Sequence, residues 1–150
     1  MIRNQTAADE YREIAVRFTS LVDAVPDEAT WKRQAPVAAW RVMSDGVQAV
    51  LDDPAAAERT LANPYIGEVP LPEAISRFCT ADVFMHTWDL ARATGQDETL
   101  DPERCAVLLD GMQPLDDLLR SSGQYGPKVE VPDDADVQTR MLAFIGRDPR

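Results

Sequence analysis

The chain has 150 residues, of which 45% are hydrophobic, and a formal net charge of −11. This length and composition are typical of one globular domain with a single core, so we predict one helical-bundle domain over residues 1–150. The acidic charge argues against partners held through phosphates, that is nucleic acid and anionic membrane surfaces, because such binding needs Lys and Arg to displace counterions. No apolar run is long enough to span a bilayer and no export signal is recognisable, so we expect a cytoplasmic protein.

Two amphipathic helices are predicted in the first third of the chain. Apolar residues recur at spacings of three and four from Thr6 to Val25, just before Pro26. A second pattern of this kind runs from about Val37 to Leu51 and stops at the sequence DDP. The following segment, NPYIGEVPLP, is rich in proline, which indicates a turn-rich connector with a short extended piece at residues 68–70.

Helical patterns continue in the second half of the chain. A third helix should begin near Pro72 and end at Gly95, and a fourth should begin at Asp101 and be kinked by Pro114.

After Gly123 an extended segment precedes a short final helix, which Asp134 or Asp136 begins and Gly146 ends. The predicted fold class is therefore all-α, a bundle of about four main helices with an irregular C-terminal extension.

The stretch TADVFMHTWDLARATG holds the only histidine of the chain, His86, with Asp82 four residues before it and Asp89 three residues after it. At about 100° per residue, these three side chains fall within an apolar helix face and should point to the core. The residues of that apolar face are Ile75, Phe78, Cys79, Met85, Leu90 and Ala93. The opposite polar stripe, expected to face water, consists of Glu73, Ser76, Arg77, Thr80 and Thr87.

Two interpretations of this polar group are open. Asp82 and His86 could hold a divalent metal, with Cys79 as a third ligand, because residues four apart on a helix reach one point. Alternatively, Asp82 and His86 only hydrogen-bond each other, and Asp89 pairs with Arg92.

A substrate pocket beside His86 would be formed by Asp89, Trp88, Tyr65 and Tyr125. The two tyrosines lie in loops, which often carry binding groups. We expect the tryptophans Trp31, Trp40 and Trp88 to pack in the core rather than to stack on a ligand. The cysteines Cys79 and Cys105 form no redox motif and are expected to be reduced.

The segments ADVFMHTWDLARATGQDETLDPE and GQYGPKVEVPDDADVQTRMLAFIGRDP resemble the DinB-like helical-bundle superfamily, specifically its mycothiol-dependent maleylpyruvate isomerase type and related metal-binding proteins. The resemblance covers most of the chain from FTSLVDAVP onward. It implies a bundle in which an acidic residue and a histidine four apart on one helix, with a histidine on an earlier helix, hold a divalent metal, usually zinc. Asp82 and His86 match the first two positions.

The chain departs from that pattern because it has no second histidine. Either Trp31, Pro36 and Trp40 are the remains of the family's histidine segment, with Gln48 at the histidine position, or the whole helix is deleted. We favour deletion, because AVLDDPAAAERT runs directly into NPYIGEVP. A bundle that lacks a helix leaves an apolar stripe uncovered, so we expect a homodimer.

The resulting functional hypothesis is a small-molecule enzyme related to the superfamily's thiol-dependent isomerases and transferases, with His86 and Asp82 as catalytic residues. Its zinc site would be weak or lost, and a low-molecular-weight thiol could be the cosubstrate. The alternatives are a metal-free binding or tailoring protein in which Asp82 and His86 form an acid/base pair, and a non-catalytic interaction module with a relic site.

Overall fold

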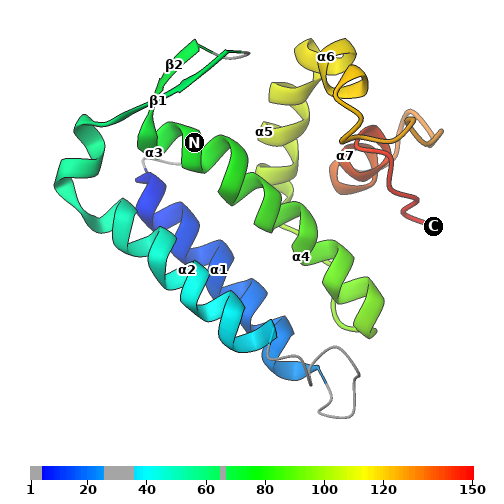
Figure 1. The fold of residues 1–150 in the computed structure, drawn as a ribbon. Coiled ribbons are helices and arrows are strands. Elements are labelled where there is room, and N and C mark those ends of the chain that lie inside the picture. Colours follow the sequence, from blue (N-terminus) through cyan, green and yellow to red (C-terminus); the bar gives the residue numbers. More distant parts are fainter. Residues whose placement is uncertain (1–4, 26–35, 65–66) are drawn as a thin grey trace. The chain divides into compact units, whose positions relative to one another are not determined.

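The protein is described by a computed structural model that covers residues 5–25, 36–64 and 67–150. Figure 1 shows a chain made mostly of helices, with one two-stranded sheet. The all-α prediction is therefore confirmed. The chain divides into two compact units, the first ending at Glu98 and the second beginning at Thr99. None of the described helices combines the length and the apolar character needed to cross a membrane.

Helix α1 (Ala7–Ala24) begins at Thr6, as predicted, because the Thr6 hydroxyl accepts a hydrogen bond of 3.1 Å from the backbone N–H of Asp9. The buried side of the helix follows the predicted apolar spacing and continues to Val25. Its buried residues are Ala7, Tyr11, Ile14, Ala15, Leu21 and Val22.

Helix α2 (Pro36–Asp52) packs on α1 and confirms the second predicted helix. Trp40 anchors it, because its indole Nε1 donates to Thr19 Oγ1 at 2.9 Å and its ring lies 4.5 Å from that of Phe18. Of the α2 side chains that the structure describes, only Ser44 is buried. Trp31 lies outside the described residues.

The connector is a β-hairpin preceded by a 3₁₀ turn, η2 (Pro54–Glu58). Strand β1 (Thr60–Asn63) pairs antiparallel with β2 (Gly67–Pro70), with Thr60 opposite Pro70. The predicted extended piece is β2. Its partner strand was not predicted, because four residues are too few to show the alternation of a half-buried strand.

A helical run then extends from Leu71 to Thr94, as predicted, and ends at Gly95, whose φ of 66° suits a left-handed cap. It is not uniform. Helix α3 (Leu71–Ala74) leads into a π-helical turn, η3 (Ile75–Thr80), before α4 (Ala81–Thr94). A π turn closes i→i+5 hydrogen bonds and so takes in more residues than an α turn. Side chains before and after η3 are consequently rotated relative to one uninterrupted helix.

The predicted faces of this helix are right for Met85, which is buried, and for Arg77, which is exposed, but they are wrong at other positions. In an uninterrupted helix, Phe78 would continue the buried stripe that joins Ala74 to Ala81, but it is 50% exposed. Thr80 and Thr87, predicted to face water, are buried. The interior side of α4 is formed by Ala81, Val83, Phe84, Met85, Thr87, Trp88 and Ala91.

The second unit contains α5 (Pro102–Met112), a 3₁₀ turn η4 (Gln113–Leu115), α6 (Asp116–Ser121) and α7 (Val137–Phe144). The interruption at η4 contains Pro114 and confirms the predicted kink. Helices α5 and α7 pack against each other. Their buried side chains include Cys105, Leu109, Met141, Leu142 and Phe144.

In the second unit, the glycine-containing segment that follows α6 contacts the one that follows α7. Gly146 has φ of 87°, and a Cβ added there would lie 3.0 Å from the Pro127 carbonyl oxygen and 3.1 Å from Gly126. The Phe144 ring nearby is covered by the Arg120 guanidinium and the Lys128 ammonium, at 5.1 and 4.9 Å. Gly146 of the GRDP segment is therefore required to be glycine, both for its positive φ and for this close backbone approach, whereas a Cβ at Gly126 would make only an ordinary contact of 3.9 Å.

The final helix gives a stability prediction, because of the two candidates Asp136 is the residue that caps it. Asp136 accepts the Thr139 N–H at 3.0 Å and the Thr139 hydroxyl at 2.7 Å, and these bonds hold the pKa of Asp136 below its ordinary value of 3.8. We expect Asp136→Ala to lower the free energy of unfolding by about 1 kcal/mol at neutral pH. Since a lowered pKa stabilises the fold above the unfolded value, the loss should shrink as the pH falls below 3.8.

Urea denaturation at neutral and acidic pH measures this difference. Asp134→Ala is the matched control, because Asp134 is exposed in the preceding turn and does not cap the helix. Equal losses in the two variants would contradict the assignment of the cap.

Candidate functional site

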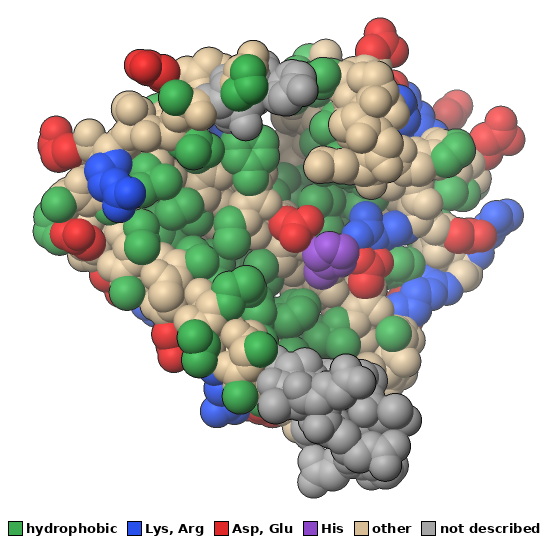
Figure 2. Space-filling model, viewed as in Figure 1, with side chains coloured by type: hydrophobic (Ala, Val, Ile, Leu, Met, Phe, Trp, Pro, Cys, Tyr) green, Lys and Arg blue, Asp and Glu red, His purple; other side chains and the backbone are tan. Residues whose placement is uncertain are grey.

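The three ionisable side chains singled out in the sequence lie on the outer side of α4. The exposed fractions of the Asp82, His86 and Asp89 side chains are 63%, 52% and 34%. Figure 2 shows the chain's only histidine, in purple, on the surface beside acidic side chains. The prediction that these residues face the core is therefore wrong.

The physical reason is the relative cost of burying a hydroxyl and a charge. Thr87 can face the interior because its hydroxyl donates to the Val83 carbonyl at 2.8 Å. A carboxylate or an imidazolium in the same place would lose its hydration without such a local backbone partner. The helix therefore buries its threonine and leaves its charged groups in water.

The imidazole of His86 lies between the two carboxylates. Its Nδ1 is 2.8 Å from Asp89 Oδ2, and its Nε2 is 3.5 Å from Asp82 Oδ1. An ionised carboxylate can only accept, so Nδ1 is the donor to Asp89. When the imidazole is neutral, its lone pair is therefore on Nε2, the nitrogen that lies toward Asp82 and solvent.

The predicted Asp82–His86 contact thus exists, but Asp89 makes the shorter one. Arg92, the expected partner of Asp89, has its guanidinium 4.9 Å from the centre of the Trp88 ring and bonds Glu98 at 3.3 Å. Trp88 is buried, as expected of a core tryptophan. Arg92 therefore covers the ring of the buried Trp88.

The four residues predicted to form a substrate pocket lie in different parts of the chain. Asp89 and Trp88 lie on α4 with His86, one beside the imidazole and the other in the interior. Tyr65 lies outside the described residues. Tyr125 is half-buried and belongs to the second unit.

Cys79, the candidate third metal ligand, is half-buried in η3. Burial raises the pKa of its thiol, and the charge of Asp82 raises it further. Cys105 is fully buried in the second unit, and burial raises its pKa to about 12. Across the described ranges 5–25, 36–64 and 67–150, no three His, Cys, Asp or Glu side chains are grouped to hold a metal ion.

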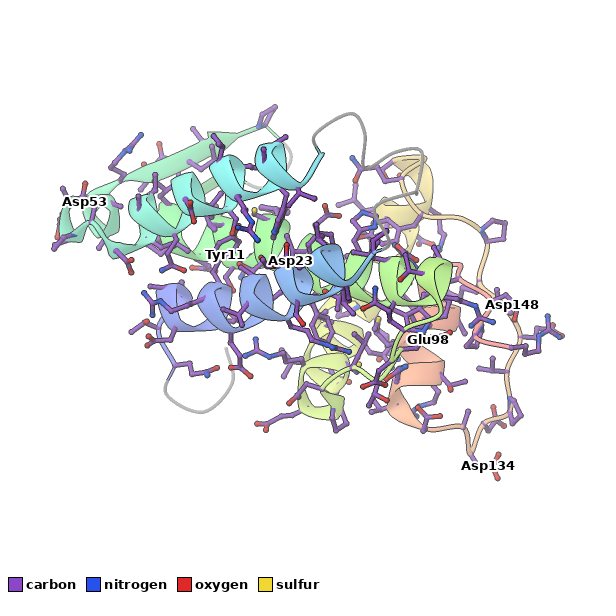
Figure 3. The ribbon with its side chains drawn as sticks, turned by 90° about the horizontal axis from the view of Figure 1, so that it is seen from below. Tyr11, Asp23, Asp53, Glu98, Asp134 and Asp148 are labelled. Carbon is purple, nitrogen blue, oxygen red and sulfur yellow. The ribbon has the colours of Figure 1, made fainter. Side chains whose placement is uncertain are left out.

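Sequence reasoning missed a second set of polar groups, which lies between α1 and its neighbours. Figure 3 shows Tyr11 between α1 and α2. Its hydroxyl is buried without a hydrogen-bond partner of normal geometry in the described structure. Burial raises the pKa of Tyr11, and the nearby Ser44 opposes this only in part. Gln48 and Thr80 also keep a buried side-chain oxygen without such a partner. Tyr11 sits on the apolar stripe of α1, so its spacing gave no sign of this.

A groove of about 500 Å³ runs between α1 and α2. Gln48, the residue considered for the histidine position, lies in it, and its amide nitrogen donates to the Ala8 carbonyl and to Asp52. The groove is lined by Arg12, Ala15, Val16, Thr19, Ser20, Asp23, Ser44, Asp45 and Gln48.

The proximity of Asp82 to Cys79 can be tested through thiol reactivity. Because the Asp82 charge raises the pKa of the Cys79 thiol, Asp82→Asn should lower that pKa and accelerate alkylation of Cys79 by iodoacetamide near pH 8. Mass spectrometry of time points gives the rate. Asp45→Asn is the control for a general change in net charge, and an equal acceleration by both variants would contradict the geometry.

Comparison with known proteins finds relatives without an assigned function. The uncharacterized proteins MT0763 and Rv0738, from Mycobacterium tuberculosis strains CDC 1551 / Oshkosh and ATCC 25618 / H37Rv, are each 30% identical to this chain over 129 residues. The matched region is 85% of this chain and 70% of each relative. No family model and no solved structure matches. The chain therefore belongs to the family of these uncharacterized mycobacterial proteins.

Proposed function

We propose that the chain is an enzyme of small-molecule chemistry, of the isomerase or transferase type, in which His86 Nε2 moves a proton. The observation that carries the proposal is the 2.8 Å contact from Nδ1 to Asp89, with Nε2 on an exposed surface. A carboxylate on one imidazole nitrogen orients the ring and makes the other nitrogen more basic. This is the arrangement that proton transfer requires.

The reaction step is simple in chemical terms. Nε2 takes the proton of a substrate group, such as the S–H of a low-molecular-weight thiol, and a thiolate and an imidazolium result. The imidazolium lies between Asp82 and Asp89, whose charges stabilise it. The proton is returned when the product leaves, so no oxidant or reductant is needed.

Membership of the DinB-like superfamily is part of this proposal. It is supported by the Asp82–His86 contact at the implied spacing of four and by the packing of the GQYGP and GRDP segments. A cytoplasmic location is also part of it and is supported by the two free thiols, Cys79 and Cys105.

A weak divalent-metal site at the same atoms is the second candidate. Two zinc ligands at ordinary bond lengths and tetrahedral angles lie about 3.3 Å apart. The 3.5 Å between His86 Nε2 and Asp82 Oδ1 is close to this value, and Asp89 on Nδ1 is a typical orienting group for a metal-bound histidine. A bound metal would act as a Lewis acid on a substrate carbonyl. The described part of the chain supplies two ligands where a zinc site needs at least three, so the chemistry of the donors fits only weak binding.

Activity of the site can be tested with the reaction that the resemblance implies, cis-to-trans isomerisation of maleylpyruvate with and without a low-molecular-weight thiol. We expect His86→Ala to lower kcat at least a hundredfold, because the proton acceptor is lost. Asp89→Asn should lower kcat less, because it removes the orienting charge but keeps the imidazole. Initial rates and far-UV circular dichroism are measured together.

Asp53→Asn is the control, because Asp53 lies at the start of η2, away from His86 in the chain, and is exposed. His86 is half-exposed, so its replacement should leave the helix folded. An unfolded His86→Ala protein would instead assign His86 a structural role, and full activity of this variant with a thiol substrate would place the reactive group elsewhere.

The metal candidate gives a separate prediction. With two ligands from the described residues, protein purified without an affinity tag should contain much less than one zinc per chain, and a chelator should remove it. Zinc titration followed through the resonances of the single imidazole should show weak binding that Asp82→Asn weakens further. One stoichiometric zinc that resists a chelator would overturn the proton-transfer proposal in favour of a metalloenzyme.

A further inference from the structure

The outward side of α2 carries no charged residue, and no other described element covers it. Val42 and Met43 are 75% and 50% exposed, and small residues surround them. Figure 2 shows hydrophobic side chains gathered on this side of the first unit. The residues of this surface, the α2 face, are Ala38, Ala39, Val42, Met43, Gly46 and Ala49.

Charged residues of α2 are confined to one edge of this face. At about 100° per residue, Arg41, Asp45 and Asp52 fall together on the side of the groove shared with α1, while the α2 face lies opposite the buried Ser44. Arg41 is held there by Asp23, at 2.7 Å. The face therefore has an apolar centre and a charged rim on one side.

Gly46 lies in the middle of this face. A glycine within a helix is destabilising relative to alanine, because it loses more backbone freedom on folding. No described atom lies within 4 Å of the position that its Cβ would take, and its φ is not in the left-handed region. Neither packing nor backbone geometry in the part of the chain that the structure describes requires glycine here. It leaves a notch in the exposed surface.

We propose that the α2 face binds the same face of a second copy, with the two α2 helices antiparallel. A two-fold axis at the level of Ser44 places residues whose numbers add to 88 opposite each other. Val42 then fills the notch at Gly46 of the partner subunit, and Ala39 meets Ala49 of the partner subunit. A surface that pairs with itself must be self-complementary, and in this register the large-against-small pair of Val42 and Gly46 occurs twice by symmetry.

The absence of charge on the α2 face removes the main obstacle to a second copy, and charge pairing at its rim favours one. Two chains of net charge −11 repel, so they can approach only through a surface without net negative charge. In the proposed register Arg41 lies two residues along from the position opposite Asp45 of the partner subunit. Its Nη2 bonds Asp23, and its Nη1 can reach that carboxylate. One helix of 17 residues is about 25 Å long, so the contact is small and the dimer should be weak.

Sedimentation velocity over micromolar to millimolar concentrations tests the proposal. The wild-type chain should change reversibly from a 16.6 kDa species to a dimer as its concentration rises. Val42→Asp should raise the dissociation constant at least tenfold, because two carboxylates would meet the apolar centre. Val107→Asp, the same change at an exposed valine of α5, is the control and should have no effect.

Disulfide cross-linking tests the register. In a Cys79→Ser background, a mixture of Val42→Cys and Gly46→Cys chains should form a covalent dimer faster than either variant alone, because only the mixture places two thiols opposite each other. A monomer at every concentration, a dimer unaffected by Val42→Asp, or equal cross-linking in all three samples would each overturn the proposed contact.

Discussion

The π turn at Ile75–Thr80 determines which side of the longest helical run faces the interior. It takes Phe78 off the stripe that an uninterrupted helix would bury and brings Thr80 inside. In α4 the buried stripe then follows Val83, Thr87 and Ala91, and the ionisable residues fall on the opposite side. The exposure of the candidate site follows from this rotation together with the low cost of burying the Thr87 hydroxyl, which lies on the same helix as the ionisable residues. A site in the core would have had to compensate the desolvation of three charges.

Exposure changes what the site can do. A buried imidazole between two carboxylates would interact strongly with both, whereas here water screens the three groups. In the proposed reaction a substrate would reach His86 without a conformational change. An exposed site has low selectivity, because an open surface excludes neither water nor competing molecules. Selectivity would then have to come from groups near Nε2, such as Asp82, whose Oδ1 lies 3.5 Å from that nitrogen.

The features that could be predicted from the sequence are local ones. Thr6 caps α1, Gly95 ends α4 and Pro114 interrupts the helices of the second unit, each for a reason contained in a few neighbouring residues. The π turn and strand β1 depend on what the segment packs against, and a periodicity of 3.6 residues cannot reveal them. The sequence contains the i, i+3 spacing that pairs His86 with Asp89. The spacing of four between Asp82 and His86 is compatible with a contact as well, and spacing alone does not tell which of the two is shorter.

The uncovered α2 face and the two-ligand site have a common explanation if a helix has been lost. In the arrangement that the resemblance implies, the third metal ligand comes from a histidine on an earlier helix, and that helix also covers its neighbours. Deletion of this one element would remove a ligand beside Asp82 and His86 and would leave part of α2 without a partner. A bundle that exposes Val42 and Met43 gains free energy by covering them, and in a homodimer the missing helix would be replaced by the partner's α2.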